Sequence, residues 1–166
     1  MRFMQIRNYD VANGPGIRTT LFVAGCTFRC PGCFNESYQD FKAGEPWTKA
    51  IEEEFIAHIK QPNIKGVSIL GGEPLDQIMD TQLYDLLKRI KEETGKTIWI
   101  FSGHLYEKLI QNERQRDILS CCDVLVDGPF ILAQKDLKLK FRGSANQRLI
   151  DLNKTREAGM VKLLDL

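Results

Sequence analysis

The chain has 166 residues, of which 43% are hydrophobic and 27% charged, and its formal net charge is +1. This length and composition predict one domain with a single core, spanning residues 1–166. A near-neutral charge with scattered basic residues gives no electrostatic footprint for nucleic acid or for an anionic membrane. The N-terminus is too polar for a signal peptide, and no apolar run approaches the roughly 20 residues that span a bilayer. We therefore expect a cytoplasmic protein that binds neither nucleic acid nor membranes.

Apolar runs alternate with amphipathic segments along the chain. Runs with the composition of strands lie at residues 17–24, 66–70, 97–101, 123–126 and 149–152. Segments with helical periodicity lie at residues 48–60, 76–93 and 105–119. This alternation predicts an α/β protein with a parallel sheet and right-handed crossovers. The segment 130–146 is basic and less periodic, and we expect the tail from Asn153 onward to fray.

Three of the five cysteines, Cys26, Cys30 and Cys33, follow the first predicted strand in C-x-x-x-C-x-x-C spacing. Clustered thiols in a reducing compartment indicate metal binding or catalysis rather than disulfides. A structural zinc site needs four protein ligands, whereas a 4Fe-4S cluster held by three cysteines keeps one iron open for a substrate or cofactor. These three cysteines are the predicted metal ligands. Cys121 and Cys122 are expected to be small buried hydrophobic residues.

Four motifs follow one another along the chain: Asn13–Arg18, the cysteine triad after Leu21–Gly25, Gly71–Pro74, and the closing run Phe141–Asp151. The triad resembles the cluster-binding loop of the radical S-adenosylmethionine (SAM) superfamily. Together with the segments around the first strand, it resembles the activating enzymes of glycyl-radical proteins. The last two motifs resemble those activating enzymes that act on the anaerobic ribonucleoside-triphosphate reductase. The resemblance covers roughly residues 5–155.

This resemblance implies a 4Fe-4S cluster and SAM as cofactors, and an open, partial (β/α) barrel of the radical SAM type as the fold. The amino and carboxylate groups of SAM would chelate the open iron. Electron transfer into the sulfonium would then give methionine and a 5′-deoxyadenosyl radical. On this interpretation the protein is an oxidoreductase that generates the glycyl radical of the anaerobic ribonucleoside-triphosphate reductase. Its partners would be the large subunit of that reductase and an electron donor such as flavodoxin.

The resemblance also points to residues that bind SAM at the carboxyl ends of the strands, where α/β folds place ligands. In the family, the motif at Gly71–Pro74 contacts the amino group of SAM, and Glu73 is the candidate acceptor. Ser102 and Asp127 each end a predicted strand and are candidates for the ribose hydroxyls, with turn or cap roles as the alternative. The predicted cofactor-binding residues are Gly32, Cys33, Phe34, Gly71, Gly72, Glu73, Pro74, Ser102 and Asp127, and no catalytic side chain is assigned.

Many superfamily members carry an aromatic residue just before the third cysteine, where this chain has Gly32. Phe34, one residue beyond the cysteine, is the alternative contact for adenine. In the closing run, Asn146 and Arg148 are further candidates for SAM or for the channel, with a solvated loop as the alternative.

Two other interpretations stay open. One is activation of a different glycyl-radical enzyme, such as pyruvate formate-lyase, or radical chemistry on a small molecule, such as deazapurine synthesis. The other is a non-catalytic iron-sulfur or zinc module. The closing run and the short chain argue against the first. The motif Gly71–Pro74 argues against the second, because an electron carrier needs no SAM-binding motif.

Overall fold

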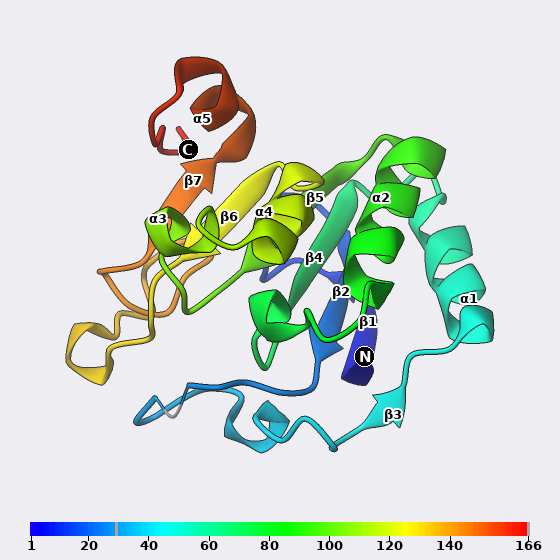
Figure 1. The fold of residues 1–166 in the computed structure, drawn as a ribbon, viewed down its shortest axis with the longest axis horizontal. Coiled ribbons are helices and arrows are strands. Elements are labelled where there is room, and N and C mark those ends of the chain that lie inside the picture. Colours follow the sequence, from blue (N-terminus) through cyan, green and yellow to red (C-terminus); the bar gives the residue numbers. More distant parts are fainter. Residues whose placement is uncertain (29, 166) are drawn as a thin grey trace.

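A computed structural model describes residues 1–28 and 30–165, so Arg29 and Leu166 lie outside the described part. Its centre is one open sheet of seven strands in the order β3-β1-β2-β4-β5-β6-β7 (Figure 1). The strands are β1 (Arg2–Asp10), β2 (Arg18–Val23), β3 (Glu45–Pro46), β4 (Gly66–Gly71), β5 (Thr97–Phe101), β6 (Val124–Asp127) and β7 (Arg148–Asp151). The α-helices are α1 (Lys49–Ile59), α2 (Gln82–Thr94), α3 (Tyr106–Leu109), α4 (Glu113–Ser120) and α5 (Leu152–Ala158).

The sheet is mixed. Its central strands β2, β4, β5 and β6 pair in parallel, whereas β1, β3 and β7 pair antiparallel at the two sides. The α/β class and the five predicted strands are confirmed. The prediction of a wholly parallel sheet was wrong. Residues 11–17 between β1 and β2 are too few for the crossover that a parallel pair requires. The radical SAM type of barrel stays a prediction.

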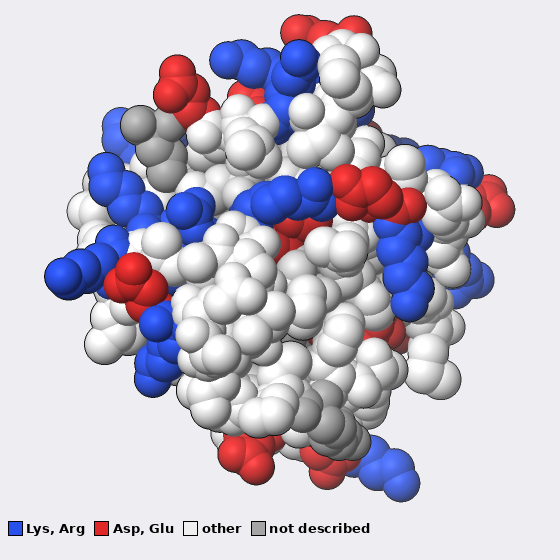
Figure 2. Space-filling view, turned by 90° about the vertical axis from the view of Figure 1, so that its left-hand side faces the viewer, with Lys and Arg blue, Asp and Glu red and all other residues white. Residues whose placement is uncertain are grey.

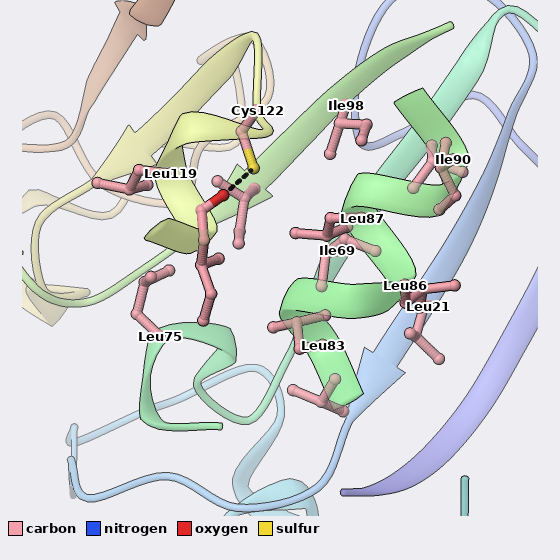
Figure 3. Packing of buried hydrophobic residues seen from close by; sticks show 14 of the residues in the cluster. Leu21, Ile69, Leu75, Leu83, Leu86, Leu87, Ile90, Ile98, Leu119 and Cys122 are labelled. Carbon is pink, nitrogen blue, oxygen red and sulfur yellow. Dashed lines mark hydrogen bonds between the residues drawn. The ribbon is translucent and has the colours of Figure 1, made fainter. Parts of the chain in front are cut away.

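One face of the sheet packs against helices. Figure 3 shows this core, to which the labelled residues Leu21, Ile69, Leu75, Leu83, Leu86, Leu87, Ile90, Ile98, Leu119 and Cys122 contribute. The core residues that helix α2 contributes recur at helical spacing and therefore lie on one face of the helix. Burial of this face holds the helix against the sheet. Cys122 is fully buried, and its Sγ donates to the carbonyl of Ile118 at 3.4 Å. The buried role predicted for Cys122 is confirmed, whereas Cys121 is only half-buried because it caps the end of α4.

The opposite face of the same strands is partly open. Side chains alternate along a strand, so Phe22, Leu70, Phe101 and Val126 point away from the helices and line a cavity. The segment 11–17 covers part of this face, where the Ser68 hydroxyl donates to the carbonyl of Asn13 at 2.6 Å. The motif at Asn13–Arg18 therefore helps to build the floor of the cavity.

Two predicted helices differ from the observed ones. The helix expected at 76–93 begins only at Gln82, because Pro74–Asp76 forms a 3₁₀ turn that the Glu73 side chain caps. The helix expected at 105–119 is divided into α3 and α4. Asn112 separates the two, since its side chain accepts from the backbone N–H of Gln115 and begins a new helix.

The C-terminal tail is ordered, which contradicts the expected fraying. Asp151 caps α5 through the backbone N–H of Lys154, and Leu152 is 1% exposed. Beyond the helix, the chain returns to β7, where Leu163 bridges Ile150. None of the helices in residues 1–28 and 30–165 has the length and apolarity that a bilayer span needs.

Candidate functional site

A cavity of about 450 Å³ lies where the loops after β2, β4 and β5 converge. The predicted site residues that line it are Cys26, Cys30, Cys33, Phe34, Gly71, Gly72, Glu73 and Ser102. Parallel pairing carries these loops to one edge of the sheet, although they are far apart in sequence. In Figure 1 the cysteine loop leaves the end of β2 and runs along the lower edge of the molecule. The structure therefore brings these residues together, and their ligands remain predictions.

The other predicted residues support the cavity without lining it. Gly32 adopts φ +71°, where a Cβ would lie 2.9 Å from the Leu132 side chain. Pro74 is buried at the start of the 3₁₀ turn. Asp127 is fully buried, and its carboxylate accepts from the Arg148 guanidinium and from the backbone N–H of Tyr106.

The two candidates in the closing run lie away from the cavity wall. Arg148 donates to Asp127 and also to Glu107 at 2.8 and 3.0 Å. The amide nitrogen of Asn146 donates to the carbonyl of Pro129, while its Oδ1 is buried without a partner in the described part of the chain. Both side chains therefore hold the connection between β6 and β7 in place.

Each sulfur of the triad accepts a backbone N–H. Cys26 Sγ accepts from Phe28 at 3.3 Å and Cys33 Sγ accepts from Asn35 at 3.4 Å. Cys30 accepts from the backbone of Phe130, which lies after β6. Such hydrogen bonds stabilise the negative charge of cluster-bound sulfur. The donor set therefore fits an iron-sulfur cluster with one iron left open.

The three thiols do not converge on one point. Among the described residues, no group of three His, Cys, Asp or Glu side chains is placed to hold a single metal ion. A cubane cluster has a different requirement, because each cysteine sulfur binds a different iron and the sulfurs surround the cluster. The three cysteine sulfurs are separate from one another and border one cavity, which suits ligands that each bind a different iron.

Two thiols of the triad, those of Cys26 and Cys30, resist loss of their protons when no metal is bound. Burial raises the pKa of the Cys26 thiol to about 12, and the negative charges of Glu73 and Asp76 add to the shift. The N–H of Phe28 offsets part of this effect. Burial also raises the pKa of Cys30. Binding of iron must therefore displace these protons, as at other thiolate sites.

Glu73 is the most deeply buried acid in the cavity wall. It is 1% exposed, and its two carboxylate oxygens accept from the backbone N–H groups of Gly103 at 2.6 Å and Leu75 at 2.9 Å. Burial raises the pKa of Glu73 to about 7, although these two hydrogen bonds oppose the shift. A carboxylate that is held rigidly and poorly solvated is a strong acceptor for an incoming N–H donor.

Sequence reasoning missed a second acidic residue beside the site. Asp76 Oδ2 accepts from the backbone N–H and the hydroxyl of Thr27 at 2.9 and 2.8 Å, and its Oδ1 accepts from His104 Nε2 at 2.8 Å. Burial acts to raise the pKa of Asp76, but the bonds from His104 and Thr27 outweigh it and lower the pKa. The bond to Asp76 raises the pKa of His104. The three residues belong to different loops, so no sequence spacing could signal the contact.

The connection between β6 and β7 forms another wall of the cavity through Phe130, Leu137 and Arg142. Phe34 contacts this wall, since its ring lies 4.9 Å from that of Phe130 and 5.1 Å from the Lys135 ammonium. Figure 2 looks from the side on which this connection lies in Figure 1. It shows basic (Lys and Arg) and acidic (Asp and Glu) side chains around a broad area without charged side chains.

Comparison with known proteins gives two kinds of match. The family model of a 4Fe-4S single cluster domain matches residues 12–150. The chain is 41% identical over 150 residues to the anaerobic ribonucleoside-triphosphate reductase-activating protein of Escherichia coli K12, covering 89% of this chain and 96% of that relative. Identity to the protein of the same name from Vibrio cholerae is also 41%, with the same coverage. For the one from bacteriophage T4 it is 34% over 152 residues, covering 90% and 93%.

Proposed function

Because the chain belongs to the family of anaerobic ribonucleoside-triphosphate reductase-activating proteins, we propose that it generates the glycyl radical of such a reductase with a 4Fe-4S cluster and SAM. The observation that carries the proposal is the shared cavity. Three cysteines in one loop and Glu73 in another face the same space of about 450 Å³. An electron carrier would need no such space beside its cluster.

Cys26, Cys30 and Cys33 are the proposed cluster ligands. The backbone N–H groups of Phe28, Phe130 and Asn35 already point at their sulfurs, so the chain is arranged to stabilise added negative charge there. When bound, the cluster supplies the electron that breaks a C–S bond of SAM. The protein's own task is to hold the two cofactors together and to keep water away from them.

Glu73 is the proposed acceptor for the amino group of SAM. Gly71 and Gly72 make room beside it, because a Cβ on Gly72 would lie 2.4 Å from the carbonyl of Gly25 and one on Gly71 2.5 Å from the backbone of Val23. Ser102 lines the same cavity and is the proposed ribose contact, and Phe34 is the proposed adenine contact. Gly32, Pro74 and Asp127 are assigned to the support of these loops.

The fold supports the proposal at a coarser level. Four parallel strands with helices on one face and a ligand cavity on the other resemble part of a (β/α) barrel. We assign the chain to the open barrel of the radical SAM type and treat residues 1–166 as one domain. An electron donor such as flavodoxin is the proposed source of the electron.

The test is to incubate the reconstituted protein without oxygen with SAM, a reductant and the reductase, and to record electron paramagnetic resonance. The expected result is a glycyl doublet on the reductase with the wild-type protein and with Cys121→Ala, because Cys121 lies away from the cavity. No doublet is expected with Cys30→Ala. SAM cleavage without a doublet on a competent reductase would favour a different glycyl-radical enzyme or a small-molecule substrate.

A further inference from the structure

Two carboxylates of one loop connect the three loops that surround the cavity. Glu73 accepts from Gly103, in the loop after β5, and its own N–H donates to the carbonyl of Gly25, in the loop after β2. Three residues later, Asp76 makes a second connection between the same loops through Thr27 and His104. The cysteine loop is therefore tied to both of its neighbours beside its first ligand.

The Asp76–His104 part of this connection is largely buried, whereas Thr27 lies at the surface. The Asp76 and His104 side chains are 9% and 13% exposed. The Phe28 ring lies 4.7 Å from the imidazole of His104, and Gly103 leaves room for it, since a Cβ there would lie 2.8 Å from the same ring. Asp76 thus fixes Thr27 by hydrogen bonds, and His104 fixes Phe28 by ring contact.

These contacts flank the first metal ligand. Thr27 follows Cys26 directly, and the N–H of Phe28 donates to Cys26 Sγ at 3.3 Å. Release of Thr27 and Phe28 would therefore move the sulfur and remove a hydrogen bond from it. Asp76 accepts both the backbone N–H and the hydroxyl of Thr27, so its loss would free both of these groups.

We propose that Asp76 and His104 are positioning residues, which hold the turn Cys26–Phe28 against the Glu73 loop and so set the distance between the cluster and SAM. This inference rests on the proposed function, which makes Cys26 a cluster ligand and Glu73 a SAM contact. Asp76 and His104 act through Thr27 and Phe28 and touch neither cofactor.

The test measures alkylation of individual cysteines by iodoacetamide in the metal-free protein, using mass spectrometry. Cys26 reports on the turn, and the core residue Cys122 reports on global unfolding, since it is fully buried behind α4. The variants are Asp76→Asn and His104→Ala. The matched control is Asp80→Asn, because Asp80 lies in the same connection and accepts from the N-terminus and from Gln82, away from the cavity.

Both variants should be alkylated at Cys26 about tenfold faster than the wild type, since charge-assisted hydrogen bonds no longer keep the turn closed. Cys122 should keep its wild-type rate, and Asp80→Asn should change neither rate. Asp76→Asn removes a negative charge near Cys26, which by itself would favour the reactive thiolate, whereas His104→Ala leaves that negative charge in place. An increase in both variants therefore reports release of the turn and not an electrostatic effect on the thiol.

An unchanged Cys26 rate in either variant would overturn the inference. So would parallel increases at Cys26 and Cys122, because these would report loss of the fold. In the reconstituted protein, His104→Ala should also lower the midpoint potential of the cluster, since Cys26 loses a hydrogen bond that favours the reduced state. Reconstitution of the wild type separates the two proposals. Release of the turn with no cluster formed would refute the proposed function alone, and a working activase with unchanged alkylation would refute this inference alone.

Discussion

Glu73 combines deep burial with two backbone hydrogen bonds, and this combination has a consequence for stability. Its pKa rises from the ordinary value of 4.5 to about 7 in the folded protein, mainly through burial. Between these values the folded state retains a proton that the unfolded state has lost. The free energy of unfolding must therefore fall as the pH rises through this window, by up to about 1.4 kcal/mol per pH unit.

We predict that Glu73→Gln removes this contribution to the pH dependence. Urea unfolding of the metal-free protein between pH 4.5 and 7 should show a smaller decrease in the variant than in the wild type. The absolute stability of the variant should also fall, because the amide nitrogen that replaces one carboxylate oxygen cannot accept, so the N–H of either Gly103 or Leu75 loses its partner. Glu54→Gln, at an exposed position of α1, is the control and should keep the wild-type slope. Equal slopes for Glu73→Gln and the wild type would show that Glu73 ionises normally.

The same residue gives a prediction for binding. Glu73→Ala should leave the iron content unchanged and weaken SAM binding by about tenfold or more, since a buried charge-assisted hydrogen bond contributes about 1.5 to 3 kcal/mol. Equilibrium binding of SAM to the reconstituted protein measures the effect. Wild-type affinity in the variant would leave Glu73 with only its structural role as the cap of the 3₁₀ turn.

At the scale of elements, the C-terminal helix α5 is part of the fold and not a loose end. Leu152 is 1% exposed in the main core, whereas Leu163, beyond the helix, is 61% exposed. Leu152→Ala should therefore lower the free energy of unfolding by about 2 to 5 kcal/mol. Leu163→Ala should change it by less than about 0.5 kcal/mol. Similar values for the two variants in urea unfolding would mean that α5 is detached in solution.

The connection between β6 and β7 shows how an element without regular structure can serve the site. Phe130 supplies an N–H to Cys30, and its ring packs on Phe34, so this connection reaches the cysteine loop. Asp127 and Arg148 fix its two ends by a hydrogen-bonded ion pair. The basic and less periodic composition of residues 130–146 gave no sign of these contacts, because every partner lies in another part of the chain.

At the scale of the whole molecule, the rim of the cavity suits a protein partner. Leu137 is 84% exposed and lines the cavity, and Leu132 in the same connection is 52% exposed. We predict that these two leucines belong to a docking surface, since exposed apolar area beside a site is one mark of such surfaces. The comparison with reductase-activating proteins makes the reductase the proposed occupant.

We predict that Leu137→Ser lowers the yield of glycyl radical at limiting reductase by more than it slows SAM cleavage in the absence of the reductase. An interface residue of this kind contributes about 1 kcal/mol or more, so binding of the reductase should weaken about fivefold. Met79→Ser is the control, since Met79 is 91% exposed and does not line the cavity. Equal radical yields for the two variants would place the docking surface elsewhere.

The sequence alone was sufficient for features that depend on neighbouring residues. The parallel strands β2, β4, β5 and β6 are short runs rich in apolar and β-branched residues, because one face of each strand packs against the helices and the other lies towards the cavity. The cysteine triad was evident for a similar reason, since one loop contains all three cysteines and their spacing is fixed locally. The gathering of residues from the ends of the parallel strands was predicted as well, because the carboxyl ends of such strands meet at one edge of the sheet.

Only the tertiary structure decided features that need a distant partner. The polar strand β1 was not predicted, because its pairing with β2 and its place at the side of the sheet stabilise it more than its own composition does. Residues 76–81 do not extend helix α2, since the Asp76 carboxylate is held by Thr27 and His104 from two other loops. Local sequence patterns fix which segments are strands and which cysteines lie together. Hydrogen bonds between distant loops then determine how the cavity around them is closed.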